Sequence, residues 1–160
     1  MLVYREGDCL RSDLSNHICF HGVNCVGVFS AGIARQIRDV YPLVYKLYRA
    51  KYANPGWSLG DVQMVKMAPN EINPSCLFVA NMATQHDVNT GGSRKVQVSY
   101  QALELCFKKL LDWCDRRGIE NVVGPKIGSG LAGGDWKRIE ALLNKELQAY
   151  PKIKIAVYTL

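Results

Sequence analysis

The chain has 160 residues, 48% of them hydrophobic, which is the size and composition of one domain with its own buried core. It contains no run of 18 apolar residues and carries charged side chains from Arg5 onward, which argues against a membrane span and a secretory leader, so we expect a cytoplasmic protein. The net charge of +6 suits an anionic partner. Its basic residues are spread over several predicted helices rather than gathered with aromatics in one tract, so nucleic acid is not expected as the primary partner.

Strand-like and helix-like segments alternate along the whole chain. In chain order the pattern predicts strands at 2–5 and 17–23, a helix from Ala31 to Tyr41-Pro42, a helix over 43–52, strands at 61–67 and 76–82, a helix over 96–117, a strand at 121–124, a helix that starts at Asp135 and ends before Pro151, and a strand at 153–160. This interleaving, without linker or repeat, indicates a single layered α/β domain with helices on both faces of the sheet. In such domains ligands bind outside the carboxyl ends of the strands.

The two longest predicted helices each have an apolar face. The helix over 96–117 carries this face at 103, 106, 107, 110 and 114, and Gly118 stands where a C-terminal cap belongs. The last helix has Asp135 as its N-cap and is expected to bury Trp136, Ile139, Leu143 and Leu147.

The cysteines show no zinc-binding pattern. There are six of them, with no Cys-x-x-Cys pair and no suitable Cys/His spacing: Cys9, Cys19, Cys25, Cys76, Cys106 and Cys114. We therefore expect reduced and mostly buried thiols, with neither a metal nor a cofactor.

A glycine-rich turn follows the strand at 121–124. Gly128, Gly130, Gly133 and Gly134 lack a Cβ, so their backbone can adopt left-handed conformations and approach a ligand closely. The helix that follows would add unpaired N–H groups and a positive partial charge, which favours an anion such as a diphosphate. The spacing fits neither a P-loop nor a dinucleotide fingerprint that opens a βαβ unit, and a tight connection with no ligand is an alternative explanation.

A second turn of this kind follows the strand at 17–23 and enters the next helix through Ala31-Gly32. Two such turns at one edge of a sheet would flank a ligand with two phosphates, and Asn24 could hydrogen-bond to a sugar hydroxyl.

Five segments in this order resemble a macrodomain. They are Gly7-Asp8, Val23-Asn24-Cys25, Ser30-Ala31-Gly32-Ile33-Ala34, Gly128-Ser129-Gly130-Leu131-Ala132 before Trp136, and the ending Val157-Tyr158-Thr159-Leu160. The resemblance covers nearly the whole chain and is weakest between Lys46 and Ser75. The chain is most similar to the branch with ADP-ribose-1''-phosphate phosphatases and the terminal ADP-ribose glutamate hydrolase. This resemblance implies one three-layer α/β/α macrodomain over residues 1–160, with a mixed central sheet.

The resemblance also implies the binding residues. Asp8 would accept a hydrogen bond from the adenine amino group, with Cys9 beside it supplying backbone, and Asn24 would contact the distal ribose. The first ribose and phosphate loop would be Ser30, Ala31, Gly32 and Ile33, the second Lys126, Ile127, Gly128, Ser129, Gly130, Leu131, Ala132 and Gly133, and Tyr158 and Leu160 would lie near the adenine. The alternatives are a solvated turn for Asp8, a cap at the strand end for Asn24, and core positions for Tyr158 and Leu160.

Two side chains are candidates for catalysis. The glutamate hydrolase uses a lysine and an aspartate, but this sequence has Met82 or its neighbours, and Ala132, at those positions. His21 precedes the Asn-Cys turn as in the phosphatase group, and its imidazole could protonate a sugar oxygen or position a water. Asp135 could orient that water. A hydrogen bond within the sheet would equally explain His21, and N-capping would explain Asp135.

The expected function is binding of ADP-ribose or ADP-ribose 1''-phosphate by a monomer, with hydrolysis of the phosphomonoester of the latter to ADP-ribose and phosphate. Two alternatives remain open: a non-catalytic ADP-ribose-binding module, and a hydrolase that removes ADP-ribose from modified macromolecules. The polar loop 84–94, which contains His86 and Asp87, could close over the outer end of the ligand.

Overall fold

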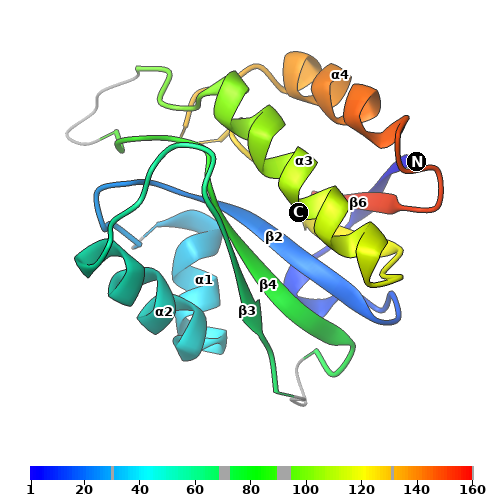
Figure 1. Ribbon diagram of the computed structural model, residues 1–160, viewed down its shortest axis with the longest axis horizontal. Helices are drawn as coiled ribbons and strands as arrows, with labels where there is room; N and C mark the ends of the chain where they lie inside the picture. The colour runs from blue at the N-terminus through cyan, green and yellow to red at the C-terminus, as the bar shows by residue number, and fades with distance from the viewer. Residues whose placement is uncertain (30, 69–72, 90–94, 131, 160) are drawn as a thin grey trace.

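A computed structural model of the chain describes residues 1–29, 31–68, 73–89, 95–130 and 132–159. Its centre is a six-stranded sheet of order β1-β6-β5-β2-β4-β3 (Figure 1). The strands are β1 (Leu2–Glu6), β2 (His17–Val23), β3 (Val62–Lys66), β4 (Cys76–Ala83), β5 (Asn121–Pro125) and β6 (Lys154–Thr159). All neighbouring pairs are parallel except β3 with β4, so the sheet is mixed, as predicted.

Helices cover both faces of this sheet, which gives the predicted three layers. They are α1 (Gly32–Val40), α2 (Pro42–Ala53), α3 (Tyr100–Arg116) and α4 (Trp136–Leu147), and a short 3-10 helix, η1 (Cys9–Arg11), follows β1. Figure 1 shows α1 and α2 together on one face and α3 and α4 together on the other. Among the described residues no helix is both long and apolar enough to cross a bilayer.

The central strand β2 supplies side chains to both halves of the core. Ile18 and Phe20 pack in the cluster beneath α3 and α4, whereas Cys19 and Val23 pack in the cluster beneath α1 and α2. This alternation follows from the period of two along a strand. Phe20 meets Phe107 of α3 edge to face, with ring centroids 5.1 Å apart.

β2 and β5 separate toward their carboxyl ends. They pair from His17 to Cys19 and no further, although β2 stays paired with β4 as far as Val23. The chain leaves β2 toward β3 and β4 and leaves β5 toward β6, so the connections run in opposite directions from this point. Ligands in open α/β sheets bind at such a switch point, and the fold therefore predicts a site between the ends of β2 and β5.

The predicted element boundaries agree with the structure within a few residues, with one larger error. The helix predicted over 96–117 begins at Tyr100, because the Ser99 side chain caps it by accepting a hydrogen bond from Ala102 N at 3.1 Å. Val98 instead forms an isolated bridge with Gln85. The five residues predicted for the apolar face of this helix are fully buried. Gly118, with a φ of +67°, follows the end of the helix, as predicted.

Two further expectations concern side chains. Trp136 is only half-buried, although the other three apolar residues predicted for that face of α4 are buried. All six cysteines are free thiols and buried, as predicted.

Candidate functional site

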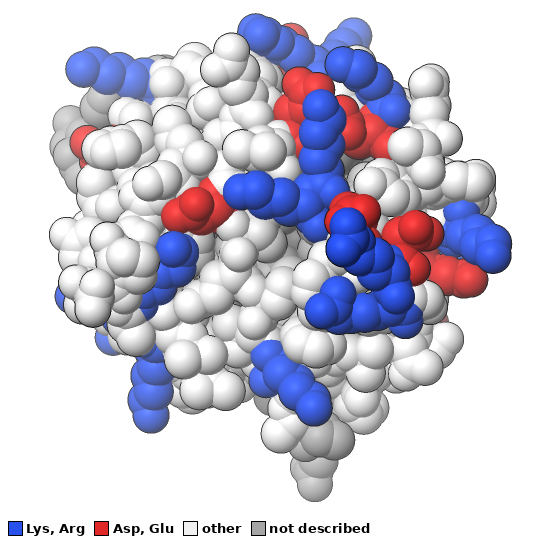
Figure 2. All heavy atoms as spheres, in the orientation of Figure 1, with Lys and Arg blue, Asp and Glu red and all other residues white. Residues whose placement is uncertain are grey.

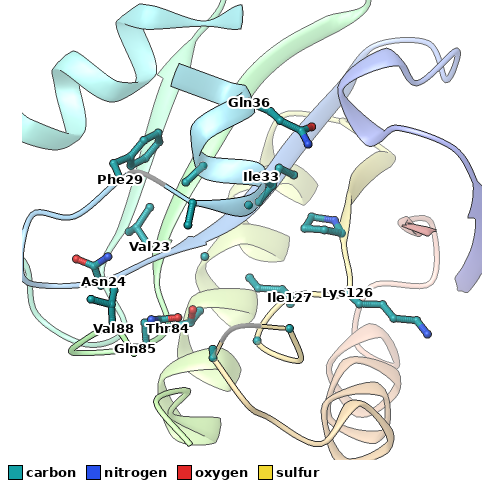
Figure 3. Close-up of a pocket in the computed structure, with 18 of the residues that line it drawn as sticks. Val23, Asn24, Phe29, Ile33, Gln36, Thr84, Gln85, Val88, Lys126 and Ile127 are labelled. Atoms are coloured by element: carbon teal, nitrogen blue, oxygen red, sulfur yellow. The ribbon is translucent and has the colours of Figure 1, made fainter. Parts of the chain in front are cut away.

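A cavity of about 670 Å³ lies at the carboxyl ends of β6, β5, β2 and β4 (Figure 3). Its lining residues come from the turn after β1, from both glycine-containing turns and from the loop after β4. The sequence placed the site at this edge of the sheet, and the separation of β2 and β5 provides the space. Ile127 lies between the two strands, where a Cβ on Gly22 would be 3.3 Å from its Cγ1.

The turn after β2 is organised by Asn24. Its Oδ1 accepts hydrogen bonds from Val28 N at 3.2 Å, Val26 N at 3.1 Å and the Tyr48 hydroxyl at 2.9 Å, and its Nδ2 donates to Val28 O at 2.6 Å. Burial raises the pKa of Tyr48 to about 12, so its hydroxyl keeps the proton that it donates. Asn24 thus shapes the turn, as the capping alternative proposed, and one Nδ2 hydrogen is left for a ligand.

This turn leads directly into the first turn of α1, which faces the cavity. Ala31, Gly32 and Ile33 all line the cavity. The N-cap residue Ala31 has no side chain that could cap the helix, and among the described residues no side-chain cap is found there, so N–H groups of the first turn are available to a ligand. Gly32 has a φ of +59°, and a Cβ there would have nothing within 4 Å. The N-terminus of α1 therefore stands at the cavity with N–H groups of the kind that bind anions.

The turn after β5 forms the opposite wall of the cavity. Lys126, Ile127, Gly128, Gly130 and Ala132 line it. Gly128 has a φ of +77°, and a Cβ there would lie 2.8 Å from Val98 Cγ2, so only glycine fits without strain. The turn closes on itself through a 2.8 Å hydrogen bond from Gly134 N to Gly128 O.

The N-terminus of α4 was expected to offer unpaired N–H groups to an anion, but its cap residue does not line the cavity. Asp135 caps the helix by accepting from Lys137 N at 3.1 Å, which occupies one of its free donors. Asp135, Ser129 and Gly133 are absent from the cavity lining. Main-chain groups of the turn itself, rather than the helix end, therefore face the cavity on this side.

The residues predicted for the adenine end do come together. Asp8, Cys9 and Tyr158 line the cavity beside β1 and β6. Asp8 accepts a hydrogen bond from Leu10 N at 2.9 Å, and the Tyr158 hydroxyl lies 2.7 Å from Ser12 Oγ. A carboxylate keeps further acceptor capacity after one such bond, so Asp8 can still receive an amino group.

The first residues of the polar loop after β4 form a further wall of the cavity. Its lining residues are Thr84, Gln85, Val88 and Asn89. It is joined to the turn after β2 by a 2.9 Å hydrogen bond from Cys25 N to His86 O. The sequence predicted that this polar loop could close over a ligand, but it identified none of these four residues as a binding residue. Gln36 of α1 also lines the cavity and was not predicted.

His21 does not line the cavity. Its side chain is fully buried between the sheet and the α1–α2 layer, with Nε2 2.5 Å from Asn81 Oδ1 on the adjacent strand and its ring edge-to-face with Phe29 at 5.3 Å. Burial lowers its pKa to about 4, so the imidazole is neutral at pH 7. This is the arrangement of the alternative explanation, a histidine hydrogen-bonded within the sheet. In this conformation neither His21 nor Asp135 lines the cavity.

The segment expected to hold a lysine in the glutamate hydrolase carries none toward the cavity. Met82 is fully buried in the core beneath α3, and the side chains of this strand end that face the cavity are Thr84 and Gln85. Ala132, at the expected aspartate position, lines the cavity without a polar side chain. Three predicted binding residues, Ser30, Leu131 and Leu160, and residues 90–94 of the polar loop lie outside the described residues.

Figure 3 shows how these parts are arranged. Phe29, Asn24, Val88 and Gln85 stand at one end of the cavity, and Lys126 stands at the other side. The order of the strands beneath places Asp8 and Tyr158 beyond Lys126, at β1 and β6. The cavity is thus an elongated groove across four strand ends, with the two turns near its middle.

Comparisons with known proteins agree with this architecture. The chain is 28% identical over 165 residues to the ADP-ribose 1''-phosphate phosphatase of Meyerozyma guilliermondii, covering 90% of this chain and 93% of that protein. It is 26% identical over 164 residues to the DNA ADP-ribosyl glycohydrolase of Mycobacterium tuberculosis, covering 99% of this chain but only 42% of that protein. The structure of the macrodomain of Mycobacterium tuberculosis DarG superposes with a TM-score of 0.83 at 24% identity, covering 100% of this chain and 98% of that one. The Macro domain model matches residues 20–143, so the chain belongs to the Macro domain family.

Proposed function

We propose that this protein binds ADP-ribose in the groove, with the adenine beside Asp8 and Tyr158 and the diphosphate between the two turns. The observation that carries this proposal is that two turns from different parts of the chain line one cavity with main-chain groups, one of them at an uncapped helix N-terminus. Such donors suit a diphosphate. The distal ribose would then lie at the β2 and β4 end, near Asn24 and Gln85.

We further propose that the protein hydrolyses ADP-ribose 1''-phosphate. A water oxygen would attack the phosphorus, the bond from phosphorus to the sugar oxygen would break, and that oxygen would take up a proton as inorganic phosphate leaves. The full-length match to a fungal protein of that name supports this reaction. Phosphoryl transfer has a loose transition state, so positioning and electrostatic stabilisation can supply most of the catalysis.

The residues available for this step differ from those expected. Among the described lining residues the ionisable side chains are Asp8, Cys9, Lys126 and Tyr158, and all lie on the β1, β6 and β5 side. At the distal end Gln85 donates from Nε2 to Asp87 O at 2.7 Å, which orients its amide. Its carbonyl oxygen is then suited to hold the attacking water. His21 would act indirectly, as the packing partner of Phe29. We expect slow turnover because none of the described residues that line this end of the groove is a general base.

A second candidate function is cleavage of ADP-ribose from nucleic acid. The 26% identity to a DNA ADP-ribosyl glycohydrolase over almost the whole of this chain favours it. The same groove would bind the ADP-ribose part, and the attached strand would leave at the distal end. A module that binds ADP-ribose without turning it over is the remaining possibility.

One set of assays separates these functions. Purified protein is given ADP-ribose 1''-phosphate and, separately, ADP-ribosylated DNA, and release of phosphate or of ADP-ribose is followed. We expect phosphate release to fall by about tenfold or more in Gln85→Leu, with ADP-ribose affinity retained, because a positioned water is lost. The matched control is Gln101→Leu on the exposed face of α3, which should behave as wild type. Binding without turnover of either substrate would overturn the phosphatase proposal and support the binding module.

A further inference from the structure

The α1–α2 layer carries most of the net positive charge of the protein. Residues 31–53 contain five basic side chains and one acidic side chain, and the rest of the chain contains 15 Lys and Arg against 13 Asp and Glu. Helix α2 itself has no Asp or Glu. Figure 2 shows Lys and Arg side chains, and no Asp or Glu, over the lower left part of this view, where α2 lies in Figure 1. The five basic residues are Arg35, Arg38, Lys46, Arg49 and Lys51.

Aromatic rings accompany these charges on the same layer. The Arg38 guanidinium of α1 lies 4.0 Å from the ring centroid of Tyr45 on α2, and the Arg49 guanidinium lies 5.1 Å from that of Tyr52. Tyr52 is 39% exposed. A surface on which guanidinium groups and rings alternate offers both phosphate contacts and stacking faces.

This surface adjoins the distal end of the groove. Arg49 Nη1 donates to Gly27 O at 2.8 Å, and a Cβ on Gly27 would lie 2.8 Å from the Tyr52 ring. The next residue, Val28, lines the cavity and is 40% exposed. The Arg49–Tyr52 pair therefore stands beside the end of the groove that would hold the distal ribose.

We propose that the α1–α2 surface binds single-stranded nucleic acid, and that a strand attached to an ADP-ribose in the groove runs along α2. The inference rests on the proposed ADP-ribose site only for the direction of the ligand. Phosphates would contact Arg35, Lys46 and Arg49, and an unstacked base would pack on Tyr52. Paired bases hide their faces within the duplex, so a single strand suits these rings better. The basic residues are scattered in the sequence, but folding brings α1 and α2 side by side and so gathers them.

The test measures fluorescence anisotropy of a labelled oligothymidylate with the unmodified protein and four variants. Lys46→Glu alters an exposed residue on α2, and Lys152→Glu makes the same charge change at an exposed residue just before the amino end of β6. We expect about tenfold weaker binding for Lys46→Glu, a salt slope reduced by about 0.7, and little change for Lys152→Glu. Tyr52→Ala should weaken binding by about tenfold, with affinity restored in Tyr52→Phe.

Calorimetry with ADP-ribose on the same variants keeps this inference apart from the proposed function. All of them should bind ADP-ribose as wild type does. Failure of the wild type to bind the oligonucleotide, or equal loss in Lys46→Glu and Lys152→Glu, would overturn the inference even if ADP-ribose binds. Displacement of the oligonucleotide by short polyglutamate at equal concentration would also overturn it, since this would indicate an acidic protein segment as the partner. Oligonucleotide binding without ADP-ribose binding would instead refute the proposed function alone.

Discussion

Replacing Gly130 by glutamate should abolish ADP-ribose binding while leaving the fold intact. Gly130 lines the cavity, and a Cβ at this position would meet no atom within 4 Å. Its φ lies outside the left-handed range, in contrast to Gly128 and Gly133 in the same turn. A side chain can therefore be added without backbone strain or displacement of the core, and we expect an unchanged melting temperature.

The magnitude follows from the charge that the substitution adds. A carboxylate about 5 Å from one phosphate charge, at an effective dielectric constant of about 20, costs about 3 kcal/mol. That corresponds to a loss of affinity of more than about 100-fold. The uncharged Gly130→Gln has nearly the same size, so the difference between the two variants isolates the electrostatic part from steric obstruction.

The assay is isothermal titration calorimetry with ADP-ribose, together with thermal unfolding of each variant. The expected order of affinity is wild type, then Gly130→Gln, then Gly130→Glu, with similar melting temperatures. If Gly130→Glu binds ADP-ribose within about threefold of wild type, no diphosphate lies against this turn and the assignment of the groove is wrong.

Three further predictions concern the fold and the two side chains that the sequence suggested for catalysis, His21 and Asp135. Asp135→Ala should lose about 1 kcal/mol of stability in urea unfolding, whereas Asp135→Ser should keep the helix cap and the stability. Neither variant should slow phosphate release from ADP-ribose 1''-phosphate. Slower release in Asp135→Ser would instead indicate a catalytic role for Asp135. Gly124→Ala should cost about 1–3 kcal/mol, because the new Cβ would lie 2.4 Å from Cε2 and Cζ of Phe20, and an unchanged melting temperature would refute this packing. Burial lowers the pKa of His21 to about 4, so as the pH falls the unfolded chain binds a proton at this imidazole before the folded chain does. The free energy of unfolding should therefore be unaffected by His21 above about pH 6.5 and should decline by on the order of 3 kcal/mol toward pH 4. Urea unfolding across this pH range should show a flatter profile for His21→Asn than for wild type, and identical profiles would contradict the buried neutral imidazole.

Elements with a strong local pattern of apolar and polar residues could be predicted from the sequence. Alternation of side chains located β2 at its observed limits and put Cys19, His21 and Val23 on one face, which in the structure is the face that α1 and α2 cover. The same alternation could not tell which residue of that face reaches the ligand. Val23, at the end of β2, lines the cavity, whereas His21, two residues earlier, is buried beneath α1 and α2.

Features that depend on distant contacts were missed for a physical reason. The described residues 84–89 and 95–98 lie outside the helices, and hydrogen bonds to distant segments hold them in place, such as Ser99 N to Thr84 O at 2.8 Å and Cys25 N to His86 O at 2.9 Å. Their local pattern predicts a loop that could close over a ligand, but it does not indicate which of their side chains line the groove. The early start predicted for α3 has a related cause. The helical spacing of apolar residues continues back to Val96, but the helix begins only after its N-cap, Ser99.

The most direct test of the account compares ADP-ribose, ADP and AMP by calorimetry with the wild-type protein. If the adenine, the diphosphate and the distal ribose each occupy their part of the groove, ADP-ribose binds most tightly, ADP more weakly and AMP weakest of all. No heat with ADP-ribose, or equal affinity for AMP and ADP-ribose, would contradict the claim that the two turns hold the diphosphate of this ligand.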